Sequence, residues 1–195
     1  MSVTGRTTSA DPTRGWVRAA GASVAFVAVL WVVEIVDQTT AGSLDRYGIR
    51  SRTDEGLGGI VVAPLLHAGW GHLEANSGPL LVLGFLVAIV STARWVGVLA
   101  WTWLVSGVGV WLLGPGNAVT VGASGLVFGL LTYLLVAGFL ERRPVGILVA
   151  VGVFIFYGTV LLGVLPGQPG ISWQGHLFGA VGGVVAAYSL ADRRR

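Results

Sequence analysis

Long apolar stretches alternate with short polar breaks along most of this 195-residue chain. A helix that crosses a membrane needs about 20 mainly apolar residues, with a range of about 17 to 25. The apolar stretches approach or reach this length, so the pattern predicts an all-α integral membrane protein with six transmembrane helices. The predicted spans are 16–36, 72–90, 95–113, 124–140, 145–165 and 176–190.

The polar breaks predict where the spans are joined. The segment 37–59 carries charges of both signs and predicts a substantial first loop outside the membrane. Glycine, proline and charged residues at 114–117, 141–144 and 166–170 predict turns. The chain is therefore predicted to contain one domain, a six-span bundle over residues 16–192. A short N-terminal tail (1–15) precedes this domain, and a basic C-terminal end (193–195) follows it.

Composition supports a membrane protein and excludes several other classes. Hydrophobic residues make up 54% and charged residues 11% of the chain, whereas soluble domains carry about 25% charged residues. The absence of cysteine excludes disulfides, thiolate metal ligands and a cysteine nucleophile. No basic patch is interleaved with aromatic residues, so no nucleic-acid partner is expected. The lipid bilayer is the predicted surrounding.

The arginines predict how the bundle is oriented. In a six-span topology the N-terminal tail, Arg94, the turn at Glu141 to Pro144 and the C-terminal arginines all lie on one side. Cytoplasmic loops are enriched in basic residues, so both termini are expected in the cytoplasm of a protein that passes several times through the plasma membrane.

Candidate chemistry starts at the small-residue tetrad Gly122-Ala123-Ser124-Gly125, where the fourth span begins. Small residues and serine commonly line contacts between membrane helices, so this tetrad alone favours a packing role. The three histidines of the chain change that interpretation. His72, Ser124 and His176 each lie near the start of an even-numbered span, which places them on the same outer side of the membrane.

The residues on this outer side match the needs of acyl transfer. Serine is a weak nucleophile until a neighbouring base accepts its proton, and His176 can be that base for Ser124. Asn76 lies one helical turn after His72, on the same face, and both side chains can donate hydrogen bonds to an oxyanion beside the backbone at Ser124. An acid that could orient the histidine is missing. Asp192 follows sixteen residues later (192 − 176), roughly 24 Å away along a helix. The pattern therefore predicts a dyad.

Glycine spacing supports close packing of the fourth and sixth spans. The fourth span contains Gly125 and Gly129, and the sixth contains Gly175, Gly179 and Gly183, all at intervals of four. This spacing lets helix backbones approach closely, although it also occurs where only packing is involved. Close approach would bring Ser124 and His176 within hydrogen-bond reach.

These motifs resemble the rhomboid family of intramembrane serine proteases. The resemblance rests on His67-x4-His72-x3-Asn76, on the GxSG tetrad, on Gly175-His176-x2-Gly179-x3-Gly183, and on the first-loop segment Leu44-Asp45-Arg46-Tyr47-Gly48-Ile49-Arg50. It covers roughly residues 16–192. It implies a six-helix rhomboid bundle whose catalytic site opens toward the extracytoplasmic side.

The resemblance also implies roles for single residues. Ser124 would be the nucleophile and His176 its base, and His72, Asn76 and the Ser124 backbone N–H would form the oxyanion site. His67 would support the entry of the second span. Phe128 would stack on the catalytic histidine in a position where some members have tyrosine. The tetrad and packing glycines Gly122, Gly125 and Gly179 would support the site, and neither a metal nor a cofactor is expected.

The expected activity is cleavage of a peptide bond in or near the transmembrane segment of another membrane protein. A rhomboid-like protein that binds without cleaving, a transporter or channel, and a histidine metal site are the alternatives. The metal reading lacks an evident fourth ligand, and inverted repeats typical of transporters are not evident. Glu34 and Glu74 receive no catalytic role, and the sequence names no substrate or oligomeric state.

Overall fold

The structure is a computed structural model that describes residues 12–41, 43–190 and 192. Within these residues it is helical, with one isolated antiparallel bridge between Ile49 and Thr120 and no strand. The elements in chain order are α1 (Pro12–Thr39), η1 (Asp45–Tyr47), α2 (Asp54–Val62), η2 (Ala63–Leu65), α3 (Trp70–Ala88), α4 (Thr92–Leu113), α5 (Ser124–Leu140), α6 (Pro144–Tyr157), η3 (Gly158–Val164) and α7 (Trp173–Leu190).

A helix is present at each of the six predicted spans, but only part of the six-span prediction is tested. Three segments are long and apolar enough to cross a membrane, namely Thr13–Thr39, Thr92–Leu113 and Pro144–Val164, and α5 is a shorter apolar helix. The helices α3 and α7 are not among these segments. The chain is a multi-pass membrane protein. The six-span count and the cytoplasmic termini stay predictions.

The two short segments that flank the predicted domain fall largely outside the described part of the chain. Residues 1–11 of the predicted tail and the predicted basic end at 193–195 are not described. The first helix begins at Pro12, so the last four residues of the predicted tail already belong to α1. Proline is common in the first turn of a helix because it has no N–H to leave unpaired there.

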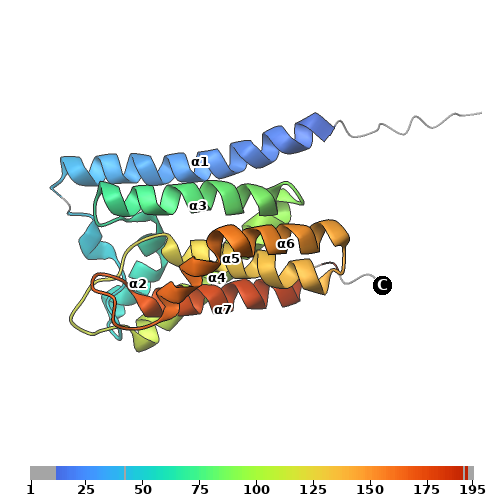
Figure 1. The fold of residues 1–195 in the computed structure, drawn as a ribbon. Helices are drawn as coiled ribbons and strands as arrows, with labels where there is room; N and C mark the ends of the chain where they lie inside the picture. Colours follow the sequence, from blue (N-terminus) through green and yellow to red (C-terminus); the bar gives the residue numbers. More distant parts are fainter. Residues whose placement is uncertain (1–11, 42, 191, 193–195) are drawn as a thin grey trace, which may run out of the picture.

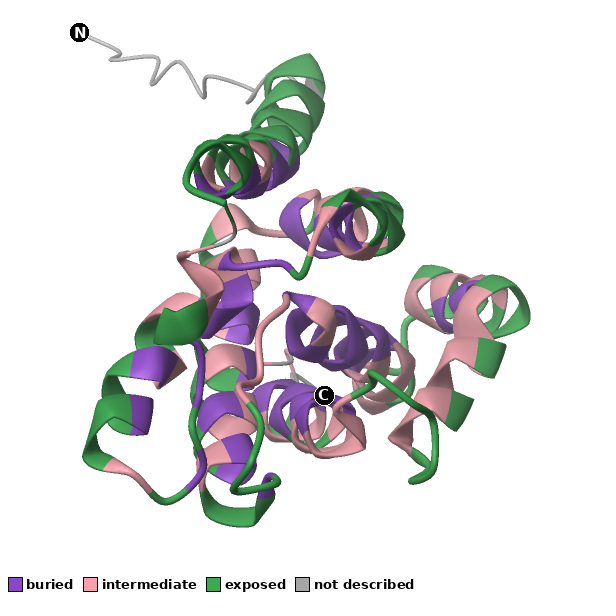
Figure 2. Ribbon diagram, turned by 90° about the vertical axis from the view of Figure 1, so that its left-hand side faces the viewer, coloured by how far each residue is buried: buried purple, intermediate pink, exposed green. Residues whose placement is uncertain are grey.

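The bundle is arranged around α5, whose residues are mostly buried. α7, α4, α6 and α3 pack against α5, whereas α1 packs mainly on α3 (Figure 1). Figure 2 shows the same order in burial: buried residues gather on the inner helices, while α1, which leads to the N-terminal trace at the top, is exposed over most of its surface. The exposed residues of α1 and α6 are largely apolar, as expected for surfaces that face lipid.

Helices α5 and α7 pack closely, and glycines make that approach possible. A Cβ atom on Gly179 would collide with the backbone of Gly125, and one on Gly183 would collide with the backbone of Gly129. Thr132 strengthens the pair, because its hydroxyl donates to the Ala180 carbonyl across the interface at 2.8 Å. The predicted contact between the fourth and sixth spans is therefore present.

The segment 37–59, which the sequence predicts as a loop, contains more structure than expected. The first helix extends to Thr39, and α2 begins at Asp54 with the Thr53 side chain accepting the Gly56 N–H at 3.1 Å. An Asp-Glu pair and three glycines make α2 look like a loop in sequence. The capping hydroxyl of Thr53 and the packing of this segment on α4 stabilise it as a helix.

The loop between α1 and α2 also closes the end of α4. The Arg52 guanidinium donates to the Leu112 and Gly114 carbonyls at 3.0 Å each, and the Ser51 hydroxyl donates to the Val110 carbonyl at 2.9 Å. The last carbonyls of a helix have no partners within the helix, so these bonds satisfy groups that would otherwise be costly to bury. The loop is thereby fixed on the same side of the bundle as the start of α5.

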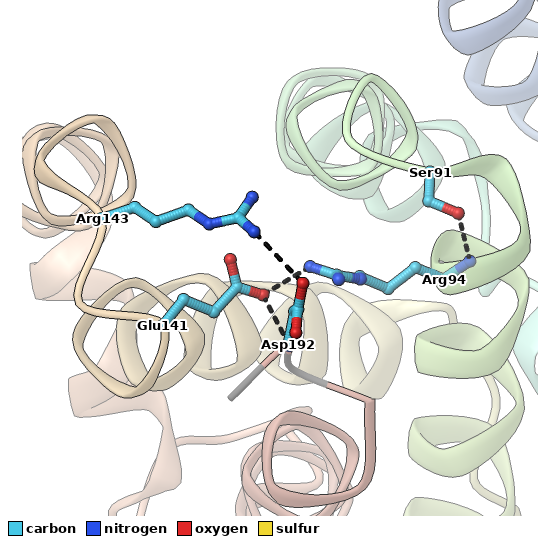
Figure 3. Close-up of polar contacts among 5 residues, drawn as sticks. All are labelled: Ser91, Arg94, Glu141, Arg143 and Asp192. Carbon is cyan, nitrogen blue, oxygen red and sulfur yellow. Dashed lines mark hydrogen bonds and ion pairs between the residues drawn. The ribbon is translucent and has the colours of Figure 1, made fainter. Parts of the chain in front are cut away.

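Four charged residues join the helices at the opposite end of the bundle, and we call them the ion cluster: Arg94, Glu141, Arg143 and Asp192 (Figure 3). Glu141 binds the Arg94 guanidinium at 2.5 Å and also accepts the Asp192 N–H at 3.1 Å. The Arg143 guanidinium binds the Asp192 carboxylate at 3.1 Å. The cluster therefore links the start of α4, the end of α5, the start of α6 and the residues after α7.

Candidate active site

Ser124 and His176 lie in contact although 52 residues separate them. Ser124 is the first residue of α5, and His176 is in the first turn of α7. The Ser124 Oγ and His176 Nε2 atoms are 2.9 Å apart. The Gly125 and Gly179 backbones set this distance, because they bring the two helices together immediately below the pair. The predicted dyad residues are thus within hydrogen-bond distance.

The second ring nitrogen of His176 has a partner that the sequence does not reveal. His176 Nδ1 lies 2.9 Å from the carbonyl oxygen of Gly163, in η3. A carbonyl oxygen can only accept, so Nδ1 carries the hydrogen and Nε2 of the neutral ring is left with its lone pair toward Ser124. This tautomer is the one that a general base for Ser124 needs.

Gly163 takes this place because of a local change in helix type. The helix α6 ends at Tyr157, and the chain continues as the 3-10 segment η3 up to Val164. A Cβ atom at Gly163 would lie 2.8 Å from Phe128 Cζ and 3.0 Å from His176 Nδ1, so only glycine lets the backbone come this close. The sequence carries no signal for this carbonyl beyond the glycine itself.

Phe128 packs flat on the candidate base. Its ring centroid lies 4.1 Å from that of His176, with an angle of 14° between the planes. Phe128 is one turn after Ser124 on the same face of α5, which explains how one helix both contacts and covers the histidine. The position agrees with the stacking that the resemblance to the rhomboid family implies.

His72 lies against the tetrad on the other side of Ser124. A Cβ atom at Gly122 would lie 2.7 Å from His72 Nε2, and the φ of Gly122 is +118°, a conformation that residues with side chains rarely adopt. His72 Nδ1 accepts the Ala68 N–H at 3.4 Å, which leaves Nε2 as the N–H donor. Gly122 therefore admits an imidazole donor beside the start of α5.

Asn76 is buried one turn below His72. Its side-chain amide donates to the His72 carbonyl at 2.8 Å. An amide group has two hydrogens, so one remains for another acceptor. The sequence predicts that Asn76 donates to an oxyanion, and its place on the His72 face of α3 fits that prediction, which no described bond tests.

His67 packs against both His72 and the tetrad. It is 1% exposed, and its Nε2 accepts the Ala123 N–H at 3.4 Å. The His67 and His72 rings meet edge to face with centroids 5.2 Å apart. Burial, and to a lesser degree the neighbouring His72, lowers the pKa of His67 to about 4, so this ring is neutral and serves as a packed acceptor.

Gly125 contacts α4 as well as the expected α7. A Cβ atom there would collide with the Ser106 side chain and lie 3.2 Å from the Gly175 carbonyl oxygen. The Ser106 hydroxyl donates to that same carbonyl at 2.9 Å. Gly125 thus leaves room for a hydrogen bond between α4 and α7. The backbone of Gly179 packs directly against the Gly125 carbonyl group.

The start of α5 offers further donors for a negative charge. The first N–H groups of a helix lack partners within the helix, and the helix dipole favours anions at this end. Ala123, which precedes Ser124, has φ −82° and ψ 2° and directs the chain into the helix. Ser124, the His176 base and these donors together have the composition of an acyl-transfer site.

Side chains that could bind a metal ion do not cluster among the described residues. In residues 12–41, 43–190 and 192, no three histidine or acidic side chains lie so that they could hold a metal ion. Glu74, in the predicted first motif, is exposed and belongs to no contact in the site, whereas Glu34 is buried at the far side of α3 from the dyad.

Comparison with known proteins identifies the class of this chain. The family model described as Rhomboid domain matches residues 55–193. The chain therefore belongs to the rhomboid family. No solved structure matches the chain significantly.

The relatives differ in what their names say. An uncharacterized protein of Mycobacterium tuberculosis (strain ATCC 25618 / H37Rv) is 47% identical over 92% of this chain and 78% of its own length. Rhomboid-like protein 11, chloroplastic, of Arabidopsis thaliana is 42% identical over 36% of this chain and 26% of its own length. The Bacillus subtilis (strain 168) protein named "Putative rhomboid protease YdcA" is 26% identical over 69% of this chain and 68% of its own length.

Proposed function

We propose that this protein is an intramembrane serine endopeptidase that uses a Ser124–His176 dyad. Nε2 of His176 accepts the Ser124 hydroxyl proton while Oγ bonds to the carbonyl carbon of the substrate peptide. The C–N bond then breaks, and the leaving amine takes the proton from Nε2. Water hydrolyses the resulting acyl-enzyme by the same proton transfers in reverse order.

The 2.9 Å contact between Ser124 Oγ and His176 Nε2 is the observation that carries this proposal. Family membership supports it, because the chain has both residues in the motifs by which it resembles rhomboid proteases. The Gly163 carbonyl supplies the orientation of His176 that an acid supplies in a triad. The dyad therefore needs no carboxylate.

The oxyanion of the tetrahedral intermediate is proposed to lie between the start of α5 and α3. His72 Nε2–H, the free Asn76 amide hydrogen and the Ser124 N–H are the donors. One such donor typically contributes a factor of about 10² to 10³ in kcat. His67, Gly122, Gly125, Phe128 and Gly179 are proposed to support this geometry.

The proposed substrates are transmembrane segments of other proteins. A peptide bond inside a regular helix is shielded by its own hydrogen bonds, so segments with glycine, proline or polar residues near the outer face should be favoured. We place the protein in the plasma membrane with both termini in the cytoplasm and the dyad toward the extracytoplasmic face. The oligomeric state is left open.

A fluorophosphonate probe tests the dyad directly. We expect labelling of the wild type and loss of labelling in Ser124→Ala and in His176→Ala. Ser189→Ala is the matched control, because Ser189 is exposed near the far end of α7 and its hydroxyl bonds only to the local Val185 carbonyl. Labelling that persists in Ser124→Ala would refute the proposal.

Comparison of membrane proteomes tests cleavage in the cell. Wild-type cells should release ectodomain fragments that are absent from cells with Ser124→Ala. If the probe labels Ser124 but no fragment depends on it, the alternative of a non-proteolytic binding protein is favoured. Activity that is lost with a chelator would point to metal chemistry.

A further inference from the structure

Three acidic side chains lie where α1 meets the first loop (residues 40–53), and the proposed reaction does not use them. Glu34 and Asp37, on α1, are 1% and 2% exposed. Asp45 is the first residue of η1. One buried oxygen of each side chain, Glu34 Oε2, Asp37 Oδ2 and Asp45 Oδ1, has no hydrogen-bond partner among the described residues. We call these three residues the carboxyl cluster.

No cation of the loop or of α2 neutralises this cluster. Arg46 is exposed and lies over the neighbouring tyrosine ring, with its guanidinium carbon 4.9 Å from the ring centroid. Arg50 is exposed, and Arg52 donates to the end of α4. The charged residues of α2, Asp54 and Glu55, are acidic and exposed. The two ion pairs that the described residues form both lie at the other end of the bundle.

A proton on Asp45 is the neutralising species that fits this geometry best. The three acids do not converge tightly enough to hold a metal ion. Each of them has an oxygen that lacks a donor, and a protonated carboxyl supplies such a donor. Burial, together with the charges of Asp37 and Glu34, raises the pKa of Asp45 from 3.8 to about 6.

Three hydrogen-bonded contacts, joined by short lengths of chain, link the cluster to the segment just before the tetrad. Asp37 Oδ1 accepts the Leu44 N–H at 2.6 Å, and the Asp45 carbonyl accepts the Gly48 N–H at 3.0 Å. The next residue, Ile49, exchanges two backbone hydrogen bonds of 2.9 Å with Thr120. Thr120 lies four residues before Ser124.

The contact between the loop and the residues that precede the tetrad is tight. A Cβ atom at Gly48 would lie 2.6 Å from the Thr120 carbonyl oxygen and 2.7 Å from Val119 Cγ1. Further along, the Gly122 N–H donates to the Ala63 carbonyl at 2.9 Å. The segment that leads into Ser124 is therefore held from outside the bundle by the first loop and by η2.

We propose that Asp45 keeps its proton beside the partnerless oxygens of Glu34 and Asp37 and thereby positions the candidate nucleophile: neutral Asp45 fastens the first loop to α1, and the loop fixes residues 120–123 through the Ile49–Thr120 bridge. The inference rests on the proposed function for its effect on Ser124. Asp45 is a positioning residue in this scheme, since it acts through the loop and not on substrate.

The direction of the pH effect follows from proton binding. Asp45 in the attached loop binds a proton at a higher pH than the same side chain in a released loop. Attachment therefore loses stability as the pH rises from about 4 to about 6, and it stays weaker above that range. Asparagine at this position has no charge to repel Asp37, so the variant should not show this loss.

Hydrogen exchange of the first loop tests the cluster without any activity. After correction for the intrinsic effect of pH, we expect wild-type amides in 43–53 to exchange about threefold faster or more at pH 7.5 than at pH 5. Asp45→Asn should show no such change. Glu55→Gln, which neutralises an exposed acid just beyond the loop, should behave like the wild type.

Fluorophosphonate labelling at the same pH values tests the link to Ser124. The ratio of the Asp45→Asn rate to the wild-type rate should be near one at pH 5 and about threefold or more at pH 7.5. The ratio is needed because protonation of His176 affects both proteins alike. A ratio that is the same at both pH values overturns the inference.

Two further outcomes separate the possible failures. Calcium that restores loop protection at pH 7.5 would show that the cluster binds a cation, and the proton inference would be wrong. Absence of Ser124 labelling at every pH would refute the proposed function, while the exchange data would still decide whether the cluster holds the loop.

Discussion

The two ends of the α5–α7 pair are joined by different physical means. At the dyad end the helices meet backbone to backbone through Gly125 and Gly179, and the polar contacts are between neutral groups. At the other end the ion cluster joins them through the Glu141 carboxylate and the Asp192 N–H. Charged pairs tolerate small displacements, whereas a hydrogen bond that must transfer a proton does not. Changes at the dyad end should therefore lower activity, and changes in the ion cluster should lower stability.

The largest effect is expected from Gly179→Ala. The added methyl group would collide with the Gly125 backbone, which cannot rotate away as a side chain could. A displacement of about 1 Å typically costs about 10² in rate, so labelling of Ser124 should fall by about that factor. Labelling per folded molecule is the measurement.

Gly152→Ala is the control for this prediction. It adds the same methyl group to a glycine of α6 that has nothing within 4 Å of the new atom. This variant should label as the wild type does. Wild-type labelling by Gly179→Ala would show that the glycine contact does not set the dyad distance.

Gly163→Ala should have the next largest effect. The new Cβ atom would press on Phe128 and His176 and move the Gly163 carbonyl away from Nδ1. Without this acceptor the imidazole loses its fixed tautomer, so kcat should fall by about 10- to 100-fold with little change in KM. Steady-state kinetics on a cleavable transmembrane peptide give both values.

Leu162→Ala is the matched control for Gly163→Ala, because Leu162 is an exposed neighbour in η3. It should leave kcat within about twofold, as for surface substitutions in general. If Gly163→Ala raised KM and left kcat unchanged, the carbonyl would contribute to substrate binding and not to orientation of the base.

Sequence patterns predict the residues of the dyad end better than they predict the contacts that hold those residues in place. Ser124, His176 and their glycines follow helical periods, and these periods determine which residues share a face. The predicted span boundaries of 95–113 and 124–140 agree with α4 and α5 to within a few residues. The packing of α5 on α7 was also predictable, because glycine spacing is visible in the sequence.

The features that the sequence did not predict depend on contacts between segments that are distant along the chain. The Gly163 carbonyl is a backbone atom, so residue type does not mark it. Gly158 lies where α6 changes to η3, but a single glycine does not reveal that the following residues form a 3-10 segment. The helix α2 looks like a polar loop because its first turn is acidic, yet it packs on α4. Periodicity within one segment does not contain this information.

Glu141→Gln should reduce stability more than activity. The Arg94 and Glu141 side chains are 18% and 10% exposed, so the substitution leaves a partly buried guanidinium without its anion. Hydrogen bonds to charged groups contribute about 1.5 to 3 kcal/mol, and we expect a loss in the lower part of that range. Thermal unfolding in detergent should show the loss, while Ser124 labelling at 25 °C stays within about twofold of the wild type.

Arg143→Gln should have the smallest effect, although it removes the other ion pair of the same cluster. The Arg143 side chain is 60% exposed, and water and salt screen its attraction to Asp192. Exposed pairs contribute about 0 to 1 kcal/mol, so thermal unfolding should change little and Ser124 labelling should not change. The two variants together separate charge from burial within one cluster, since each removes one charge. Equal destabilisation by both variants would mean that the exposed Arg143–Asp192 pair stabilises the bundle as much as the partly buried Arg94–Glu141 pair. Burial of the ion pair would then not explain how this end of the bundle is held together.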